Sequence, residues 1–538
     1  MSGSSRRAFL ARFLALGASA SSLAPLLAAC TGDGDPGSDE PPTRRRPAGS
    51  AKKYEGRIVI ATRYNPSARA RQALAAAYRR HQPGVELVWM TDDYPDAASY
   101  ARWLEQQLAV NNVGPDIVSG NYAPTFRRYV NLDEYRAQVN PYTGREWEKD
   151  YDFARYPEVD ARGERTSIGT EAMNLLFYYN KDIFAEVGVE PPRDFNELLD
   201  VCAKLHAARR RPLALSFDPA VTTWMSSVYF DQYHDAWVDT VRAQPGDWCW
   251  DPELDGTFEY DAKDPRLHTR YTFNPQRFYQ GLADHTLRFD TPAMLDLVTN
   301  LTRLVPRYAT ADFFTGSSPY PAFLRRQAAM LVDGAWTMCQ LAQDLADPTP
   351  GRLQQLGLQE EALEPFEWDV FEFPPMRGPL VQSELRPFEG TTGTYLSVID
   401  KGPDHTEMVM DFLMFWVSAE GYTAFLEGEA KANALTPQGP LLISGVSYDK
   451  QVEDLFAKVR SHGSIAPAYG NFWVVGAGGR SSVDLRNHFV SVLQGKFDPQ
   501  DYATRLQRYV ETHLEEMVKL AGLSMDDIAN PARRPATV

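Results

Sequence analysis

Three short apolar runs alternate with amphipathic segments of helical period at the start of the globular part of the chain. The expected strands are residues 57–61, 85–90 and 115–118, and helices are expected from Ser67 and around Tyr100. Strands that alternate with helices of this length pair in parallel through right-handed crossovers. The sequence therefore predicts an α/β fold.

Polar and aromatic residues follow two of these expected strands. Tyr64 and Asn65 come after the first strand, and Asn121 and Tyr122 come after the third. In parallel sheets, ligands bind beyond the carboxyl ends of the strands. We therefore expect these four residues to lie at the rim of a binding site.

The first thirty residues have the order of an export signal. A charged start with Arg6 and Arg7 precedes an apolar stretch that is too short and too interrupted for a membrane span. Residues 5–10 resemble a bacterial twin-arginine signal, and residues 27–30 (LAAC) resemble a lipobox, whose cysteine is lipidated. We predict a signal peptide over 1–29 and a membrane anchor at Cys30. The alternative is an ordinary secretory signal with a chance cysteine.

The segment that follows Cys30 has a different composition. It is rich in Gly, Pro, Ser and charged residues and has no apolar periodicity, which predicts a flexible tether over residues 30–53. Beyond it, no run of 18 apolar residues offers a transmembrane helix. The expected location is outside the cytoplasmic membrane, with the globular body held on its outer face.

Charge and composition exclude several classes of protein. The formal net charge of −16 argues against a nucleic-acid partner, and 43% hydrophobic residues argue against a disordered chain. Four cysteines in 538 residues exclude a disulfide scaffold, although the sequence leaves open a bridge among Cys202, Cys249 and Cys339.

No motif for catalysis or for a cofactor is present. The sequence lacks HExxH, GxSxG, GxxxxGK and GxGxxG, and its nine histidines have no metal-ligand spacing. An acidic run between Asp251 and Asp264 lacks the spacing of a calcium loop and is interpreted as a solvated face. We expect no catalytic residue, cofactor or metal.

Ordered sequence blocks carry a family resemblance. They are the PDIV strand at 115–118, LLFYYNKDIFAEVGVEPPRDFNELL from Leu175, AAMLVDGAWTM from Ala328, FEFPPMRGP from Phe371, GTTGTYLSVIDKG from Gly390, VMDFLMFWVSAEGYTAFL from Val409 and ALTP from Ala434. In this order they resemble the bacterial extracellular solute-binding proteins of carbohydrate importers. The resemblance covers about residues 54–440.

This resemblance implies a two-lobed periplasmic-binding-protein-like fold of type II, with a hinge and a ligand cleft between the lobes. Expected crossings near 169–170, 376–390 and 437–440 assign 54–168 and 391–437 to lobe 1. Lobe 2 then comprises 169–390 and 438–538. Residues 236–287 exceed the usual pattern and are interpreted as an insertion.

The resemblance also selects ligand-binding candidates. Trp336 is expected to stack on a sugar, Gly334 to let the backbone approach the ligand, and Trp224 and Trp473 to add aromatic surface from their Gly, Ser and Thr-rich surroundings. The alternative for each tryptophan is packing inside its lobe.

Polar candidates lie at the expected lobe crossings. Thr391 and Thr392 are expected to offer hydroxyl groups to the solute, and Glu171 to accept a hydrogen bond from it. A surface position is the alternative for Glu171.

The function implied is a monomeric, lipid-anchored receptor that delivers a small solute, expected to be a carbohydrate, to the membrane permease of an ABC importer. Two alternatives stay open. One is a secreted glycoside hydrolase, which needs only two carboxylates close in space. The other is a lipoprotein that presents its ligand to a signalling partner.

Overall fold

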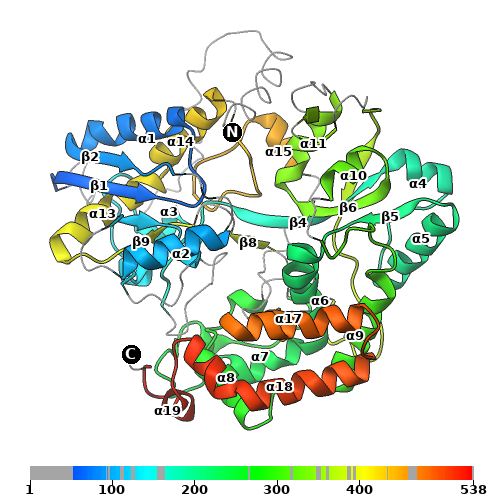
Figure 1. Ribbon diagram of the computed structural model, residues 1–538. Coiled ribbons are helices and arrows are strands. Elements are labelled where there is room, and N and C mark those ends of the chain that lie inside the picture. The colour runs from blue at the N-terminus through cyan, green and yellow to red at the C-terminus, as the bar shows by residue number, and fades with distance from the viewer. Residues whose placement is uncertain are drawn as a thin grey trace, which may run out of the picture.

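The computed structural model describes residues 52–92, 94, 97–109, 114–122, 128–153, 164–264, 267–315, 319–346, 353–354, 356–358, 363–384, 389–391, 395–432, 434–457 and 469–535. The expected signal peptide, lipidated Cys30 and nearly all of the tether lie outside these residues. The part described is a mixed α/β structure with two sheets and many helices (Figure 1).

The strands are β1 (Glu55–Ala61), β2 (Gly84–Trp89), β3 (Ile117–Val118), β4 (Ala172–Asn180), β5 (Arg211–Ala214), β6 (Ala328–Gly334), β7 (Trp368–Phe371), β8 (Glu389–Thr391) and β9 (Ser397–Val398). The helices are α1 (Ala68–His81), α2 (Ala97–Leu108), α3 (Trp147–Asp150), α4 (Lys181–Val187), α5 (Phe195–Ala207), α6 (Ser226–His234), α7 (Val238–Val241), α8 (Pro275–Ala283), α9 (Pro292–Leu304), α10 (Tyr320–Leu324), α11 (Trp336–Ala346), α13 (Pro403–Trp416), α14 (Ala419–Lys431), α15 (Lys450–Phe456), α16 (Phe472–Val475), α17 (Gly479–Leu493), α18 (Pro499–Leu520) and α19 (Met525–Ala529).

Lobe 1 is built on the first sheet, whose strand order is β2-β1-β3-β9. As expected, β1 pairs in parallel with both β2 and β3, while β9 closes the sheet in the antiparallel direction. Helix α1 begins at Ser67, whose hydroxyl accepts from the Ala70 amide at 3.1 Å, and its apolar face with Leu74 and Tyr78 is buried. Helices α13 and α14 complete this core.

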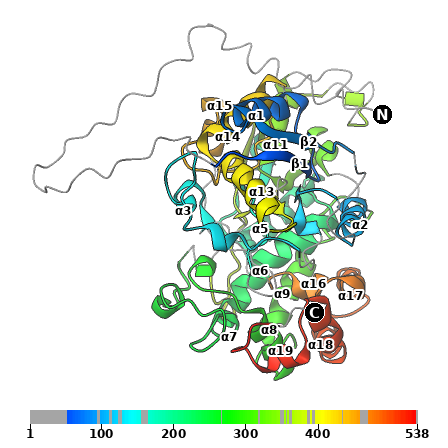
Figure 2. The same cartoon turned by 90° about the vertical axis from the view of Figure 1, so that its left-hand side faces the viewer.

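Lobe 2 combines a second sheet with a layer of helices. The sheet has the order β5-β6-β4-β7, and β8 pairs with the start of β4. Helices α6 to α9 and α16 to α19 share one continuous hydrophobic core with this sheet. In both views, α7, α8, α18 and α19 lie at the end of the molecule opposite to α1 and α15 (Figures 1 and 2).

The chain passes between the lobes along β4. Ala172 packs in the core of lobe 1 and Leu175 in that of lobe 2, so the first crossing lies between them, slightly later than the expected 169–170. At the second crossing, Gln382 still lies on α6, its amide bonded to the Gln232 carbonyl, whereas Leu396 pairs with Ile168 of lobe 1.

The third expected crossing, near 437–440, is placed too early. Leu442, Ile443 and Tyr448 pack in the core of lobe 1, and Ile443 forms a β-bridge with Tyr151. Residues 441–448 therefore belong with lobe 1. A short peptide without regular structure can form its backbone hydrogen bonds in either lobe. The sequence pattern alone therefore did not show to which lobe these residues belong.

The expected insertion, residues 236–287, packs on the C-terminal helices. Its helix α8 contacts both α18 and α19, and the side-chain amide of Gln276 donates to the carbonyl oxygen of Asp527 at 2.7 Å. Cys202, Cys249 and Cys339 are free thiols, so no disulfide links this region to the rest of the lobe.

In the part of the chain that the structure describes, no helix combines the length and apolar composition that crossing a membrane requires.

Candidate functional site

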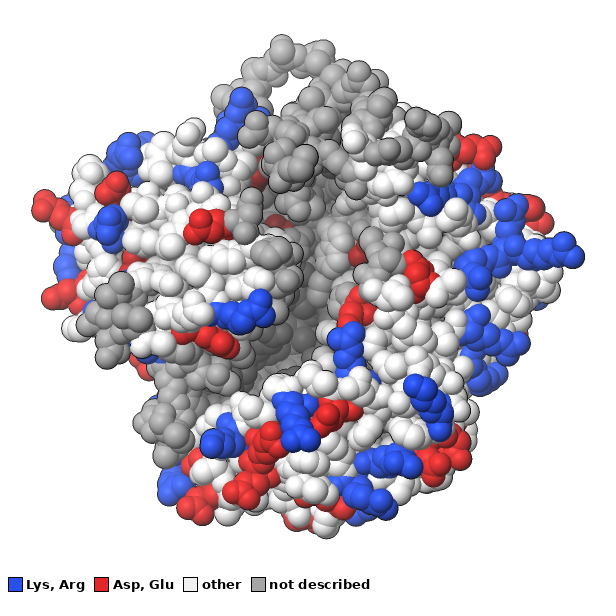
Figure 3. All heavy atoms as spheres, viewed as in Figure 1, with Lys and Arg blue, Asp and Glu red and all other residues white. Residues whose placement is uncertain are grey.

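A hollow separates lobe 1 from the rest of the molecule in the space-filling view (Figure 3). The candidate site is built from residues that follow the ends of strands in each of the two lobes. On the side of lobe 1, these residues follow the carboxyl ends of β1, β2 and β3. On the side of lobe 2, they follow the carboxyl end of β6.

Tyr64 and Tyr122 lie together at the edge of the lobe 1 sheet, as expected from parallel pairing of β1 and β3. Tyr64 is 48% exposed, and the guanidinium of Arg63 lies over its ring at 4.9 Å. Burial, together with the neighbouring Tyr64, raises the pKa of Tyr122 to about 12. This edge therefore presents an accessible aromatic ring beside a neutral phenol.

Asn65 extends the same edge. Its side-chain amide donates to the Asp92 carbonyl oxygen, which follows β2, at 3.1 Å. The backbone of Asn121 lies in a 3₁₀ turn, Gly120–Tyr122, but its side chain lies outside the described residues.

Trp336 and Trp224 form an aromatic pair in lobe 2. Their ring centroids are 6.0 Å apart with an interplanar angle of 63°, an edge-to-face arrangement. Trp336 is the first residue of α11, and Trp224 lies in the π-helical segment Phe217–Met225 that precedes α6. Trp224 is buried at 8% exposure and Trp336 is only partly buried, so Trp336 holds the more accessible ring.

Gly334 lies against the indole of Trp336. A Cβ atom at this position would lie 2.1 Å from the ring of Trp336. The absence of a side chain therefore makes room for that indole, and the expected approach of the backbone to a ligand stays a prediction. The hydroxyl of Tyr178 donates to the Gly334 carbonyl oxygen at 2.7 Å and fixes the end of β6.

Asp333 is a site residue that sequence analysis missed. Its carboxylate accepts from the Gly334 amide at 2.8 Å and from the Thr337 hydroxyl at 2.9 Å. Withdrawal from water raises the pKa of Asp333 to about 6, and hydrogen bonds, including one from Trp336, oppose that rise. The available signal was the Asp-Gly pair at 333–334, which Ala335 separates from Trp336.

This aromatic group lies close to the lobe crossing. The amide of Ala335, next to Trp336, donates to the Asn174 carbonyl oxygen of β4 at 2.8 Å. Asn174 is in turn paired with Glu389 in β8. The position of Trp336 is therefore tied to the strand along which the chain passes from one lobe to the other.

Glu171 is neither a surface residue nor free to bind a solute. It is buried at the crossing, where it accepts from the Gln438 amide at 2.7 Å and from the Tyr422 hydroxyl at 3.2 Å. Burial raises its pKa to about 7, against these hydrogen bonds. Glu171 therefore connects β4 to the returning chain at 438, which corrects the expected contact with ligand.

Trp473 is also a correction. Its side chain has no exposed surface, its indole donates to the Gly470 carbonyl oxygen at 3.1 Å, and its ring packs on Phe489. The surrounding Gly and Asn residues predicted a loop, but α16 and α17 enclose the ring. Thr391 pairs through its backbone with Ala172, whereas its side chain and the whole of Thr392 lie outside the described residues.

Two other features have the character of binding sites. A surface cavity of about 450 Å³ lies between α7 and α8, lined by polar and charged residues that include Asp239, Arg242 and Arg277. Its lining has no aromatic ring. Separately, Asp231, Asp235 and His268 have the spacing of metal ligands.

The comparisons with known proteins agree with this architecture. A family model described as bacterial extracellular solute-binding protein matches residues 64–353, more than half of the chain. A search of curated proteins finds no match.

Solved structures share the fold. The chain is similar to the cyclic α-maltosyl-1,6-maltose binding protein from Arthrobacter globiformis, with 15% identity, a TM-score of 0.54, and coverage of 86% of this chain and 100% of that one. A chitin oligosaccharide binding protein has 16% identity and a TM-score of 0.53, over 86% and 99% of the two chains. UgpB from Mycobacterium tuberculosis, in complex with glycerophosphocholine, has 14% identity and a TM-score of 0.53, over 86% and 100%.

Proposed function

The chain belongs to the bacterial extracellular solute-binding proteins, and on this premise we propose that it is the receptor of an ABC-type importer. It captures an oligosaccharide or sugar derivative between its two lobes and delivers it to the membrane permease. It carries out no covalent chemistry. It acts as a monomer outside the cytoplasmic membrane, held there by a lipid on Cys30 after export through the signal peptide.

Aromatic rings that follow strand ends in both lobes carry this proposal. Trp336, supported by Trp224, lies at the end of β6, and Tyr64 lies at the end of β1 in the other lobe. Sugars present flat C–H faces that stack on such rings, and their hydroxyl groups need a few polar partners. Asp333 and Asn65 are the nearby polar groups of this kind.

The crossing strand supports a closing motion. Residues of β4 belong to both lobes, and a rotation about this strand changes the width of the hollow with little change inside either core. A solute that contacts both lobes binds the closed form better than the open form, and it shifts the population toward the closed form by that difference in affinity. The closed form is then the one that docks on the permease.

The similar structures widen the range of solutes worth testing. Two of the three proteins reported above are named as oligosaccharide-binding proteins, and the third was determined in complex with glycerophosphocholine. An identity of 14–16% shows a common fold and does not identify the solute of this protein. The test panel therefore includes mono- and oligosaccharides, sugar phosphates and glycerophosphodiesters.

The first experiment measures thermal unfolding of the protein with each compound, followed by hours of incubation and analysis for products. A solute at a hundred times its Kd adds about 2.7 kcal/mol to the free energy of unfolding. Stabilisation with intact solute supports the receptor. Stabilisation with cleavage products identifies a glycoside hydrolase instead. If the protein binds a solute but loss of the permease does not change cellular uptake of that solute, the signalling lipoprotein is favoured.

The site itself is tested with Trp336→Ala. Loss of stacking is expected to weaken solute binding by about 1–3 kcal/mol, by analogy with aromatic anchors in other interfaces, when measured by isothermal titration calorimetry. Trp368→Ala is the matched control, because Trp368 is also a partly buried tryptophan but lies on β7, paired with the far end of β4 at Asn180. An unchanged affinity in folded Trp336→Ala removes this residue from the site.

A further inference from the structure

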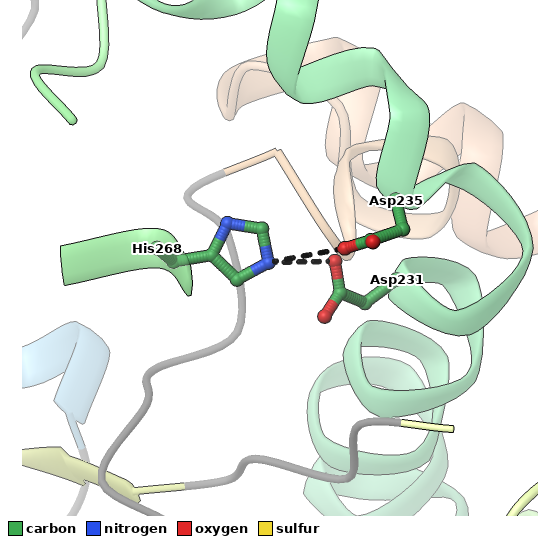
Figure 4. A group of neighbouring side chains, drawn as sticks. All are labelled: Asp231, Asp235 and His268. Carbon is green, nitrogen blue, oxygen red and sulfur yellow. Dashed lines mark hydrogen bonds and ion pairs between the residues drawn. The ribbon is translucent and has the colours of Figure 1, made fainter. Parts of the chain in front are cut away.

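Three side chains with metal-binding groups meet inside lobe 2, outside the candidate site. Asp231 lies near the end of α6, Asp235 follows one turn later at the start of a 3₁₀ turn (Asp235–Trp237), and His268 comes from a second 3₁₀ turn (Leu267–Thr269) in the insertion. Both carboxyl groups and the imidazole point toward one another (Figure 4). Sequence spacing gave no sign of this cluster, because His268 comes 37 positions after Asp231.

The three groups are close and enclosed. Nε2 of His268 is 2.9 Å from an oxygen of Asp231 and 4.0 Å from an oxygen of Asp235. His268 is 6% exposed, Asp231 is 1% exposed and Asp235 is 0% exposed. Ligands of a metal with bonds of about 2.1 Å lie about 3.0–3.4 Å apart, which falls within the range of these separations.

Each carboxyl group also has an oxygen without a partner. Oδ2 of Asp231 and Oδ1 of Asp235 are buried and accept no hydrogen bond from any described residue. In the same part of the chain, no Lys or Arg forms an ion pair with either carboxylate. Among the described residues, His268 is the ion-pair partner of these carboxylates, and a metal ion would add positive charge beside the two oxygens that accept no hydrogen bond.

The surroundings hold the groups in place for ligation. The Nδ1 atom of His268 is 2.8 Å from the hydroxyl oxygen of Tyr271, a contact that fixes the orientation of the imidazole ring. The hydroxyl of Tyr260 donates to Oδ2 of Asp235 at 2.6 Å and leaves Oδ1 toward His268. Tyr260 is 39% exposed, whereas Asp235 has no exposed surface.

We propose that Asp231, Asp235 and His268 bind a divalent transition-metal ion such as Zn²⁺. One imidazole nitrogen with two carboxylate oxygens is a donor set that suits Zn²⁺ and its neighbours, whereas Ca²⁺ and Mg²⁺ take oxygen donors alone. The ion would join the insertion to α6. Helix α6 also contacts the segment at the second lobe crossing, because Gln232 accepts hydrogen bonds from the amides of Met376 and Gln382.

Metal binding is measured on the protein purified without a polyhistidine tag and freed of metal with a chelator. Isothermal titration with Zn²⁺ is expected to give one equivalent, and Co²⁺ is expected to give visible absorption bands of a site with nitrogen and oxygen donors. Zn²⁺ is also expected to raise the thermal midpoint. Absence of binding by the wild-type protein overturns the proposal and leaves a hydrogen-bonded ion cluster in its place.

His268→Gln and Asp235→Asn are expected to abolish this binding. His206→Gln and Asp239→Asn, at exposed positions of the same lobe, are the matched controls and are expected to keep it. Zn²⁺ binding that persists in folded His268→Gln overturns the proposal.

Because a buried substitution can prevent folding, X-ray absorption at the zinc edge of the loaded wild-type protein provides an independent test. One imidazole in the first shell supports the site, and its absence overturns it. The result of these metal-binding tests is independent of the proposed solute, since none of the measurements uses a solute.

Discussion

At the scale of single residues, the strand that a residue follows predicted its position better than its residue type did. The meeting of Tyr64 and Tyr122 was predictable because parallel strands end at one edge of a sheet. Trp473 was not, since Gly and Asn around it predicted a loop, whereas the helices that bury it come later in the chain. Glu171 depends on partners more than 250 positions away, which no local pattern contains.

Glu171 gives a prediction for the effect of pH on stability. Its pKa is about 7 in the folded protein and 4.5 ordinarily. As the pH rises from 4.5, the unfolded chain releases this proton first, so stability is lost progressively until the pH passes 7. The loss for this group is on the order of 3 kcal/mol.

Glu171→Gln is expected to remove that loss, because the amide imitates the protonated carboxyl group. Its oxygen can accept from Gln438 and its NH₂ group can donate to Tyr422. Urea unfolding at pH 5 and pH 8 is the measurement, with Glu86→Gln at an exposed position as the control. Equal pH dependence in Glu171→Gln and the wild type would contradict the assignment.

At the scale of elements, helix starts and buried faces were the most predictable features. The buried face of α1, with Leu74, Ala77 and Tyr78, is the one expected from helical spacing. At the start of α5, the spacing of Asp194 and Glu197 is typical of a capping box. Asp194 caps the helix, but Glu197 does not complete the reciprocal contact, because its carboxylate accepts from the Arg193 amide at 2.8 Å. The lobe crossings were less predictable, since non-local pairing decides them.

The cap on α5 supplies the prediction at this scale. Oδ1 of Asp194 accepts from the Glu197 amide at 3.0 Å. Asp194→Ala leaves that amide without its partner and is expected to lower the free energy of unfolding by about 1 kcal/mol. Asp194→Asn keeps a side-chain acceptor and is expected to stay within a few tenths of a kcal/mol of the wild type. Denaturant unfolding compares the two, and equal loss in both would assign the effect to charge.

At the scale of the whole molecule, the two-lobed architecture was predictable from the order of the family-like blocks, and the structure confirms it. The contact between the insertion and the C-terminal helices was not predictable, because neither region matched those blocks. Contacts such as that of Gln276 with Asp527 depend on the final packing of helices and leave no periodic signal in sequence.

Closure of the lobes is the prediction for the whole molecule. A saturating solute is expected to lower the radius of gyration measured by small-angle X-ray scattering, because it draws lobe 1 toward lobe 2 across the hollow. Trp336→Ala at the same solute concentration is expected to scatter as the solute-free protein does. A radius of gyration that does not change when wild-type protein is saturated would contradict a closing receptor.

The contacts of Gln276 also set an order of events in time. Its side-chain amide reaches the carbonyl oxygens of Asp527, Asn530 and Arg533, the first of them 251 positions later in the chain. During synthesis, the ribosome makes residues 236–287 long before these partners exist. The side chain of Gln276 therefore gains these partners only when nearly all of the described chain has emerged, whereas β1, β2 and α1 can pack on one another at once.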